Sequence, residues 1–150
     1  MPQSLSNILV HLIYSTKNRE RLITDVIREE LHRYAAAILK SCDCPALLIN
    51  SVEDHVHTVF VLARTAAISD VVEEVKKSTS KWIKSKDASF SRFYWQSGYG
   101  AFSVSQSNLD QVLKYVANQA EHHRHKTFQE EDREFLKRHG ITYDERYVWD

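Results

Sequence analysis

The sequence predicts an α+β domain with an antiparallel sheet, and three observations support this fold class. The hydrophobic patterns follow one another in the order strand, helix, strand, strand, helix, strand, helix. The second and third strands are separated by only a few polar residues, which fits a hairpin and therefore antiparallel pairing. The 150 residues suit one domain with a sizeable core, which we expect to span residues 1–150. The order is that of the ferredoxin-like split βαβ arrangement with additional C-terminal helices, a fold that many unrelated activities share.

The first half of the chain supplies one strand, one helix and the hairpin. Residues 6–17, "SNILVHLIYSTK", are rich in β-branched and aromatic side chains and predict the first strand. Apolar positions recur at helical spacing over residues 25–42, with Thr24 or Asp25 as the N-cap. The segments "PALLINSV" and "HTVFVLA" then predict the two strands of the hairpin.

The second half supplies the remaining elements. Residues 69–86 carry an apolar stripe behind a Ser-Asp cap and predict a helix that is basic towards its end. Residues 98–107, "GYGAFSVSQS", predict a short strand, and a helix with an Asn cap follows it. A short charged helix over residues 127–140 should stop at Gly140, and an aromatic tail ends the sequence.

Composition and charge narrow the class of protein. Hydrophobic residues make up 43% of the chain, with three glycines and two prolines, as in a compact soluble protein. No apolar run approaches the ~20 residues of a membrane span, and the first residues do not resemble a signal peptide, so we expect a cytoplasmic protein. Twenty basic residues balance twenty acidic ones, so any contact with nucleic acid must come from a local patch.

Two histidines interrupt a segment that otherwise reads as a buried strand. His55 and His57 lie two positions apart in "EDHVHTVFV", so their side chains should leave the same face, about 7 Å apart along the strand. Two neutral imidazoles that converge on one point form half of a metal site or a general acid and base pair. The alternative is that both are hydrogen-bonded structural residues of the strand.

A second pair of polar residues lies sixty positions further on. Tyr115 and Gln119 are four apart in the predicted helix and should share one face. A tyrosine hydroxyl is a poor nucleophile at its ordinary pKa of about 10, but a metal that polarises a phosphate can compensate. A glutamine carbonyl beside two histidines would complete a three-ligand site. Alternatively, Tyr115 is a core aromatic and Gln119 a surface residue.

Four motifs in this order resemble the small single-tyrosine HUH transposases of bacterial insertion sequences and their REP-associated relatives. The motifs are "HLIYSTKNR" (11–19), "DHVHTVFVL" (54–62), "WQSGYGAFSVS" (95–105) and "YVANQAEHH" (115–123). The ending "GITYDERYVWD" is also similar to that of the family. The resemblance covers nearly the whole chain.

The resemblance implies a function and a role for each matching residue. His55, His57 and Gln119 match the ligands of a divalent metal, Mg²⁺ or Mn²⁺, and Tyr115 matches the nucleophile. In such enzymes the tyrosine attacks single-stranded DNA at hairpin-flanked sites and forms a 5′-phosphotyrosine bond, and the free 3′-hydroxyl later rejoins strands without ATP. The resemblance further implies a bacterial, nucleoid-associated homodimer in which Tyr115 of one chain can complete the histidine pair of the other.

Basic residues suited to DNA phosphates gather in two segments. One set follows the first strand and the other lines the second helix close to Trp82. The predicted DNA-binding residues are Lys17, Arg19, Arg21, Lys77, Lys81 and Lys84. The alternative for the helix is an ordinary solvated face. The alternative function for the whole chain is a catalytically inactive nucleic-acid-binding module or repressor with structural histidines.

The strand "GAFSVS" and the aromatic tail predict self-association. A short sheet of this kind leaves a pairable edge strand, which proteins either protect or use for association. Tyr143, Tyr147 and Trp149 add apolar surface that a second chain could cover. We therefore expect a two-fold dimer through the strand edges.

Overall fold

The sheet is four-stranded and antiparallel. The computed structural model of the chain describes residues 3–122, 126–144 and 148. Its strands are β1 (Ile8–Ser15), β2 (Ala46–Ser51), β3 (His55–Leu62) and β4 (Gly100–Val104), in the spatial order β2-β3-β1-β4. Every neighbouring pair is antiparallel, and β2 and β3 form the expected hairpin. The predicted ferredoxin-like α+β arrangement is thereby confirmed.

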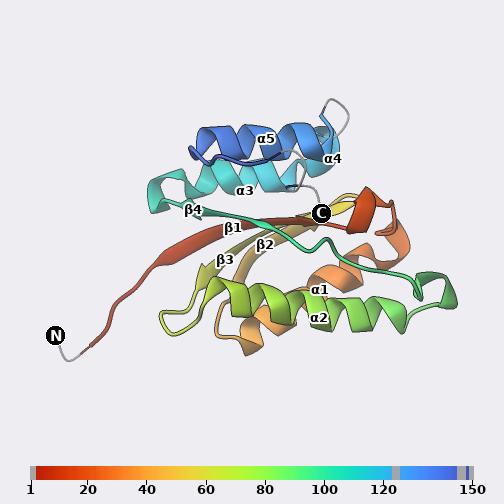
Figure 1. Cartoon of the computed structure of the whole chain (residues 1–150). Helices are drawn as coiled ribbons and strands as arrows, with labels where there is room; N and C mark the ends of the chain where they lie inside the picture. The colour runs from red at the N-terminus through yellow and green to blue at the C-terminus, as the bar shows by residue number, and fades with distance from the viewer. Residues whose placement is uncertain (1–2, 123–125, 145–147, 149–150) are drawn as a thin grey trace.

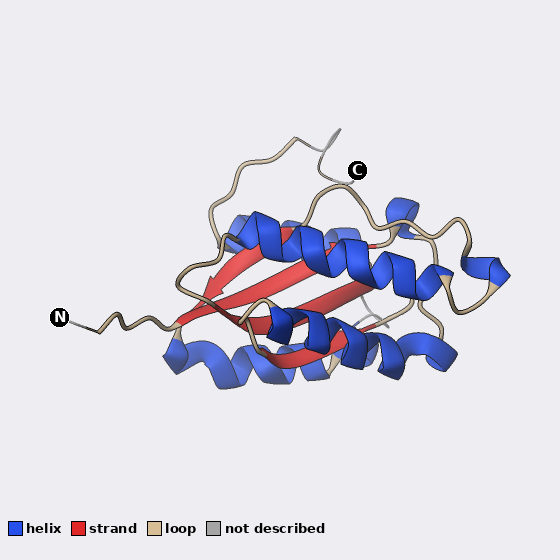
Figure 2. Cartoon of the chain, turned by 90° about the horizontal axis from the view of Figure 1, so that it is seen from below, coloured by secondary structure: helices blue, strands red, loops and turns tan. Residues whose placement is uncertain are grey.

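Helices cover both faces of this sheet. Helices α1 (Asp25–Ser41) and α2 (Ile68–Lys84) lie on one face, whereas α3 (Leu109–Ala117) and α5 (Phe128–Arg138) lie on the other, as Figure 1 shows. Figure 2 looks onto the sheet through the α1 and α2 layer. The short helix α4 (Gln119–His122) follows α3, and the 3₁₀ turns η1 (Lys17–Arg19), η2 (Ala88–Phe90) and η3 (Gln106–Asn108) lie in the connections.

Strand alternation divides the interior into two hydrophobic cores. Val10, Leu12 and Tyr14 of β1 face α1 and α2 and join the larger core. The smaller core lies under α3 and α5. Its buried members are Ile13, Phe102, Phe128, Phe135 and Leu136. Because every second residue of a strand faces the same way, the positions alternating with the larger core, including His55 and His57, face α3 and α5.

The predicted third helix is not continuous. The sequence predicts one helix through Tyr115 and Gln119, but α3 ends at Ala117 and α4 begins at Gln119. Asn118 caps α3 with φ −99° and ψ 28°, and its backbone N–H donates to the carbonyl oxygens of Lys114 and Tyr115. Asparagine readily leaves helical geometry at a helix end, which explains the break.

The charged helix near the C-terminus has the expected ends. Thr127 and Glu130 form a capping box at the start of α5, and Gly140, with φ +66°, follows its end. Tyr143 is partly exposed, whereas Tyr147 and Trp149 of the predicted apolar tail lie outside the described residues. None of the helices in the described ranges has both the length and the apolar character that a membrane crossing requires.

Candidate metal centre and nucleophile

His55 and His57 are buried side by side on the sheet face that α3 and α5 cover. Both side chains have no exposed surface, and their ring centroids are 5.3 Å apart. His55 also packs on the ring of Phe128, which belongs to α5. The shared orientation predicted from their spacing is confirmed, and the space they face is closed by the C-terminal helix.

Each of these histidines has a hydrogen-bond partner at its Nδ1 atom. His55 Nδ1 lies 2.6 Å from Oδ1 of Asp54, and His57 Nδ1 lies 2.8 Å from Nε2 of His11. Burial and the neighbouring His57 lower the pKa of His11 to about 3, so this ring is neutral. Histidines that bind metals usually have their second ring nitrogen held in this way. The Nε2 atoms of His55 and His57 are therefore the ones directed at the shared site.

A carboxylate that sequence reasoning missed faces both Nε2 atoms. Oε1 of Glu131 lies 2.6 Å from His57 Nε2 and 4.0 Å from His55 Nε2. Glu131 comes from α5 and is almost completely buried. One donor atom from each of the three residues lies within 4.8 Å of the others. Glu131 falls in a helical stripe with Phe128 and Phe135, and that spacing was the available signal that it faces inwards.

The donor set fits a divalent metal. Ligand atoms around a small divalent cation are about 3 Å apart, and the two separations between Glu131 and the histidines lie on either side of that value. Two imidazoles and one carboxylate suit Mn²⁺, and a carboxylate also suits Mg²⁺. The held Nδ1 atoms add the outer contacts that such sites use.

Tyr115 lies beside this cluster in the same chain. Its ring centroid is 6.0 Å from that of His57 and 5.5 Å from that of Phe135. Burial raises the pKa of Tyr115 well above its ordinary value, and the nearby negative charge of Glu131 raises it further. The hydroxyl is therefore protonated in the metal-free protein.

Gln119, the predicted third ligand, is fully buried at the start of α4. Its amide nitrogen lies 3.4 Å from the carbonyl oxygen of Tyr115. It is therefore not the surface residue of the alternative interpretation. Its role as a metal ligand stays a prediction, as do those of His55 and His57 and the nucleophilic role of Tyr115.

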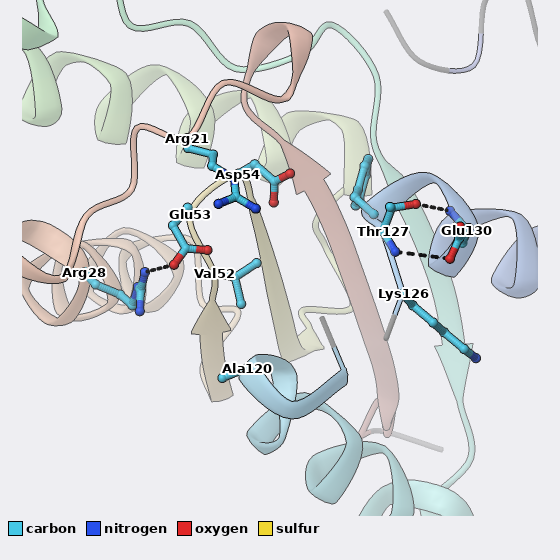
Figure 3. A pocket seen from close by; sticks show the side chains of 10 residues that line it. Arg21, Arg28, Val52, Glu53, Asp54, Ala120, Lys126, Thr127 and Glu130 are labelled. Atoms are coloured by element: carbon cyan, nitrogen blue, oxygen red, sulfur yellow. Dashed lines mark hydrogen bonds and ion pairs between the residues drawn. The ribbon is translucent and has the colours of Figure 1, made fainter. Parts of the chain in front are cut away.

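Two cavities are lined by residues that neighbour the cluster. A cavity of about 520 Å³ is lined by Asp54 and Phe128, which contact His55, and by the cations Arg21, Arg28 and Lys126 (Figure 3). A smaller cavity of about 240 Å³ reaches the ring of Tyr115. Tyr115 and two residues that contact His55 can thus be approached from the surface.

The predicted DNA-binding residues fall into two groups in space. Lys17, Arg19 and Arg21 follow the end of β1, where Ser15 is paired with His55 in the sheet. Arg21 lines the larger cavity.

The lysines of α2 belong to the opposite layer. Of these, Lys84 is linked to the first group, because its ammonium lies 4.3 Å from the ring centroid of Tyr94, whose carbonyl oxygen accepts from the Lys17 backbone. Lys77 and Lys81 come earlier in α2. Figure 1 shows that α2 covers the sheet face opposite to that of α3 and α5.

Solved structures similar to this one share its fold. A protein from Deinococcus radiodurans assigned as a transposase matches with a TM-score of 0.62 and 21% identity, over 77% of this chain and 93% of that chain. A REP-associated tyrosine transposase bound to a REP hairpin matches with a TM-score of 0.60 and 14% identity, over 81% of this chain and 71% of that chain. A search of curated proteins found no match.

The sequence also matches a family model. Residues 4–119 match the model described as "Transposase IS200 like". Those residues include both histidines, Tyr115 and Gln119, whereas Glu131 lies beyond them. Because the match spans well over half of the chain, the protein belongs to the IS200-like transposase family.

Proposed function

We propose that this transposase cleaves and rejoins single-stranded DNA with Tyr115 as its nucleophile. We further propose that His55, His57 and Glu131 hold a divalent metal, Mg²⁺ or Mn²⁺. The observation that carries the proposal is the position of the Tyr115 ring 6.0 Å from His57, beside three converging donor atoms in a buried site. A tyrosine, a metal site and an adjoining cavity that carries cationic side chains are parts that phosphodiester cleavage can use.

Tyr115 would attack the phosphorus of a phosphodiester. The phenolic oxygen forms a bond to phosphorus as the bond to the 3′-oxygen breaks, which leaves a 5′-phosphotyrosine and a 3′-hydroxyl. The tyrosine proton is released and the leaving 3′-oxygen takes up a proton, so the step consumes none. When bound, a divalent cation would polarise the phosphate and make the hydroxyl more acidic. The chain itself holds the tyrosine ring in place through its edge-on contacts with His57 and Phe135.

The substrate that we propose is single-stranded DNA with a hairpin. The similar REP-associated tyrosine transposase is bound to a REP hairpin, which supports this class of DNA. In the present chain, Arg21 and Lys126 line the cavity beside His55 and offer contacts for the phosphate backbone. Lys17 and Lys84 add cations beside the exposed ring of Tyr94, and Arg19 lies in the same turn as Lys17.

We also propose that the protein assembles as a homodimer. We further propose that it lies in the bacterial cytoplasm at the nucleoid, and that residues 1–150 form a single domain. The edge position of β4 supports the homodimer, because only β1 pairs with β4 among the described strands. The cis placement of Tyr115 indicates that a dimer is not needed to bring the nucleophile to the histidines.

A covalent-adduct assay tests the proposed function. The protein is incubated with single-stranded hairpin oligonucleotides of REP type and Mn²⁺, denatured, and separated by electrophoresis. A band of protein joined to DNA is expected with Mn²⁺ and not with a chelator. Hairpin binding without any adduct over a panel of flanking sequences would favour the inactive binding module instead.

A further inference from the structure

His57 is the middle residue of a row of three buried side chains. Its Nε2 atom is 2.6 Å from Oε1 of Glu131, and its Nδ1 atom is 2.8 Å from Nε2 of His11. His11 comes from β1, and only 2% of its surface is exposed. His57 therefore contacts a carboxylate on one side and a second imidazole on the other.

Glu131 and His11, the two contacts of His57, determine which ring nitrogen of His57 carries the proton. A neutral imidazole carries one N–H and one lone pair. Contact with the Glu131 carboxylate requires the proton on Nε2, because an ionised carboxylate can only accept. The lone pair on Nδ1 must then accept from Nε2–H of His11. A metal at the same position instead requires the lone pair of Nε2, so that the proton must lie on Nδ1 and needs an acceptor.

His55 faces no such conflict. Its Nδ1 atom lies 2.6 Å from the carboxylate of Asp54, which holds the N–H on Nδ1 whether or not a metal is present. The partner of His57 is an imidazole, whose Nε2 donates when it carries the ring proton and accepts when the proton is on Nδ1.

We propose that His11 is a positioning residue that lets His57 exchange tautomers when the metal binds. The proton on His11 Nε2 passes to His57 Nδ1, and the proton on His57 Nε2 leaves to solvent as the metal takes its place. His11 Nδ1 takes up one proton from the water of the cavity that His11 lines, so neither ring changes its charge. The hydrogen bond between the rings is kept and only its direction reverses. His11 thus avoids a buried unpaired polar atom on His57 in either state, a defect that costs about 1–3 kcal/mol. This inference rests on the proposed metal site.

Variants of His11 can separate its role as a hydrogen-bond partner of His57 from its contribution to packing. The ring of His11 meets the ring of Phe135 edge-on, with the ring centroids 5.1 Å apart. His11→Phe keeps this contact and removes both ring nitrogens. His11→Gln keeps an amide that can donate or accept. His32→Phe is the control, because His32 also makes a histidine hydrogen bond, to Ser51 at 2.7 Å, but lies on α1 across the sheet.

The readout is Mn²⁺ affinity, measured by calorimetry on the intact metal-stripped chain without DNA. His11→Phe should weaken binding about 10–100-fold, the usual effect of losing an outer contact of a ligand histidine. His11→Gln should stay within about 3-fold of the wild type, and His32→Phe should match it. Wild-type affinity in a folded His11→Phe protein would overturn the inference and leave the metal site standing. No Mn²⁺ binding by the wild type would overturn both.

A spectroscopic test needs no variant. Nitrogen-15 spectra of the histidine rings should show His57 protonated at Nε2 without metal and at Nδ1 with saturating Mg²⁺, whereas His55 should carry its proton on Nδ1 in both. A His57 ring protonated at Nδ1 in both states would overturn the exchange.

Discussion

His55 and His57 occupy strand positions where valine would pack without a polar cost. Burying an imidazole without partners costs roughly 1–3 kcal/mol for each unpaired polar atom. The chain meets this cost with Asp54, His11 and Glu131, which contact the ring nitrogens. Such a network is more than a strand needs for stability, and it leaves two Nε2 atoms directed at one carboxylate. The arrangement supports the metal site proposed above.

Tyr115 is the residue on which the proposed chemistry depends. Tyr115→Phe should abolish the covalent adduct and leave hairpin affinity within about 3-fold, because the hydroxyl acts only in the chemical step. The partly exposed Tyr143, which is distant in sequence, serves as the matched control, and Tyr143→Phe should cleave like the wild type. Undiminished adduct from the Tyr115→Phe protein would assign the nucleophile to another residue.

At the scale of elements, helix α5 differs most from its appearance in the sequence. Its composition is that of a solvated helix, yet Glu131 and Asp132 lie in the stripe that it buries against the sheet. Burial and the neighbouring Glu131 raise the pKa of Asp132 to about 6. Two adjacent buried carboxylates on one helix support the proposal that α5 contributes to the site as well as to the core.

Glu131→Gln tests whether α5 supplies a metal ligand. The substitution keeps the shape of the side chain and removes its charge, so Mn²⁺ affinity should fall by about 100-fold or more. Glu134→Gln, one turn along, is the control, because Glu134 is exposed and pairs with Lys126 at 2.7 Å. Calorimetry on folded, metal-stripped protein gives both values. If the two variants bind Mn²⁺ equally, the third ligand must be sought in Gln119.

The two basic segments can be compared by the DNA contacts they make. Arg21→Ala should weaken hairpin binding about 5–10-fold and reduce the salt dependence of binding by about one phosphate contact, because Arg21 lines the cavity beside His55. Lys81→Ala should have a smaller effect, since Lys81 belongs to the opposite layer. Hairpin affinity is measured for both variants over a range of salt concentrations. An equal loss of affinity in the Arg21→Ala and Lys81→Ala proteins would show that the DNA also reaches α2.

At the scale of the whole molecule, the sandwich brings Tyr115 to the histidines of its own chain. A mixture of Tyr115→Phe and His57→Ala proteins should therefore stay as inactive as either variant alone. Subunit exchange is confirmed first with differently tagged chains, and sedimentation gives the state of assembly. Recovery of adduct to about a quarter or more of the wild-type level would mean that the helix of one chain serves the histidines of another.

The half-buried His32 also gives the whole fold a pH dependence. Burial, followed by the nearby Arg28, lowers the pKa of His32 to about 4, below the ~6.5 of an unfolded chain. Between these values the unfolded state binds more protons, so the free energy of unfolding should fall as the pH drops from about 6.5 to 4. In the wild type, the free energy of unfolding should decrease between pH 7.5 and pH 5. His32→Leu should make this decrease smaller by on the order of 1 kcal/mol, allowing for solvent screening. Urea titrations at the two pH values measure it, and identical losses in both proteins would assign the acid sensitivity elsewhere.

The sequence alone determined the order of elements, the antiparallel hairpin and the shared face of His55 and His57, because strand and helix periodicities are local properties. It also placed Tyr115 and Gln119 in one motif, although the break at Asn118 depends on a local cap that periodicity does not register. Only the tertiary structure brought Glu131 and His11 to His57, from 74 and 46 positions away in the chain. Long-range contacts of this kind follow from how α5 packs on the sheet and how β1 pairs with β3. The spacing of Glu131 with Phe128 and Phe135 indicates that its side chain faces inwards, but no local spacing shows which residues it meets.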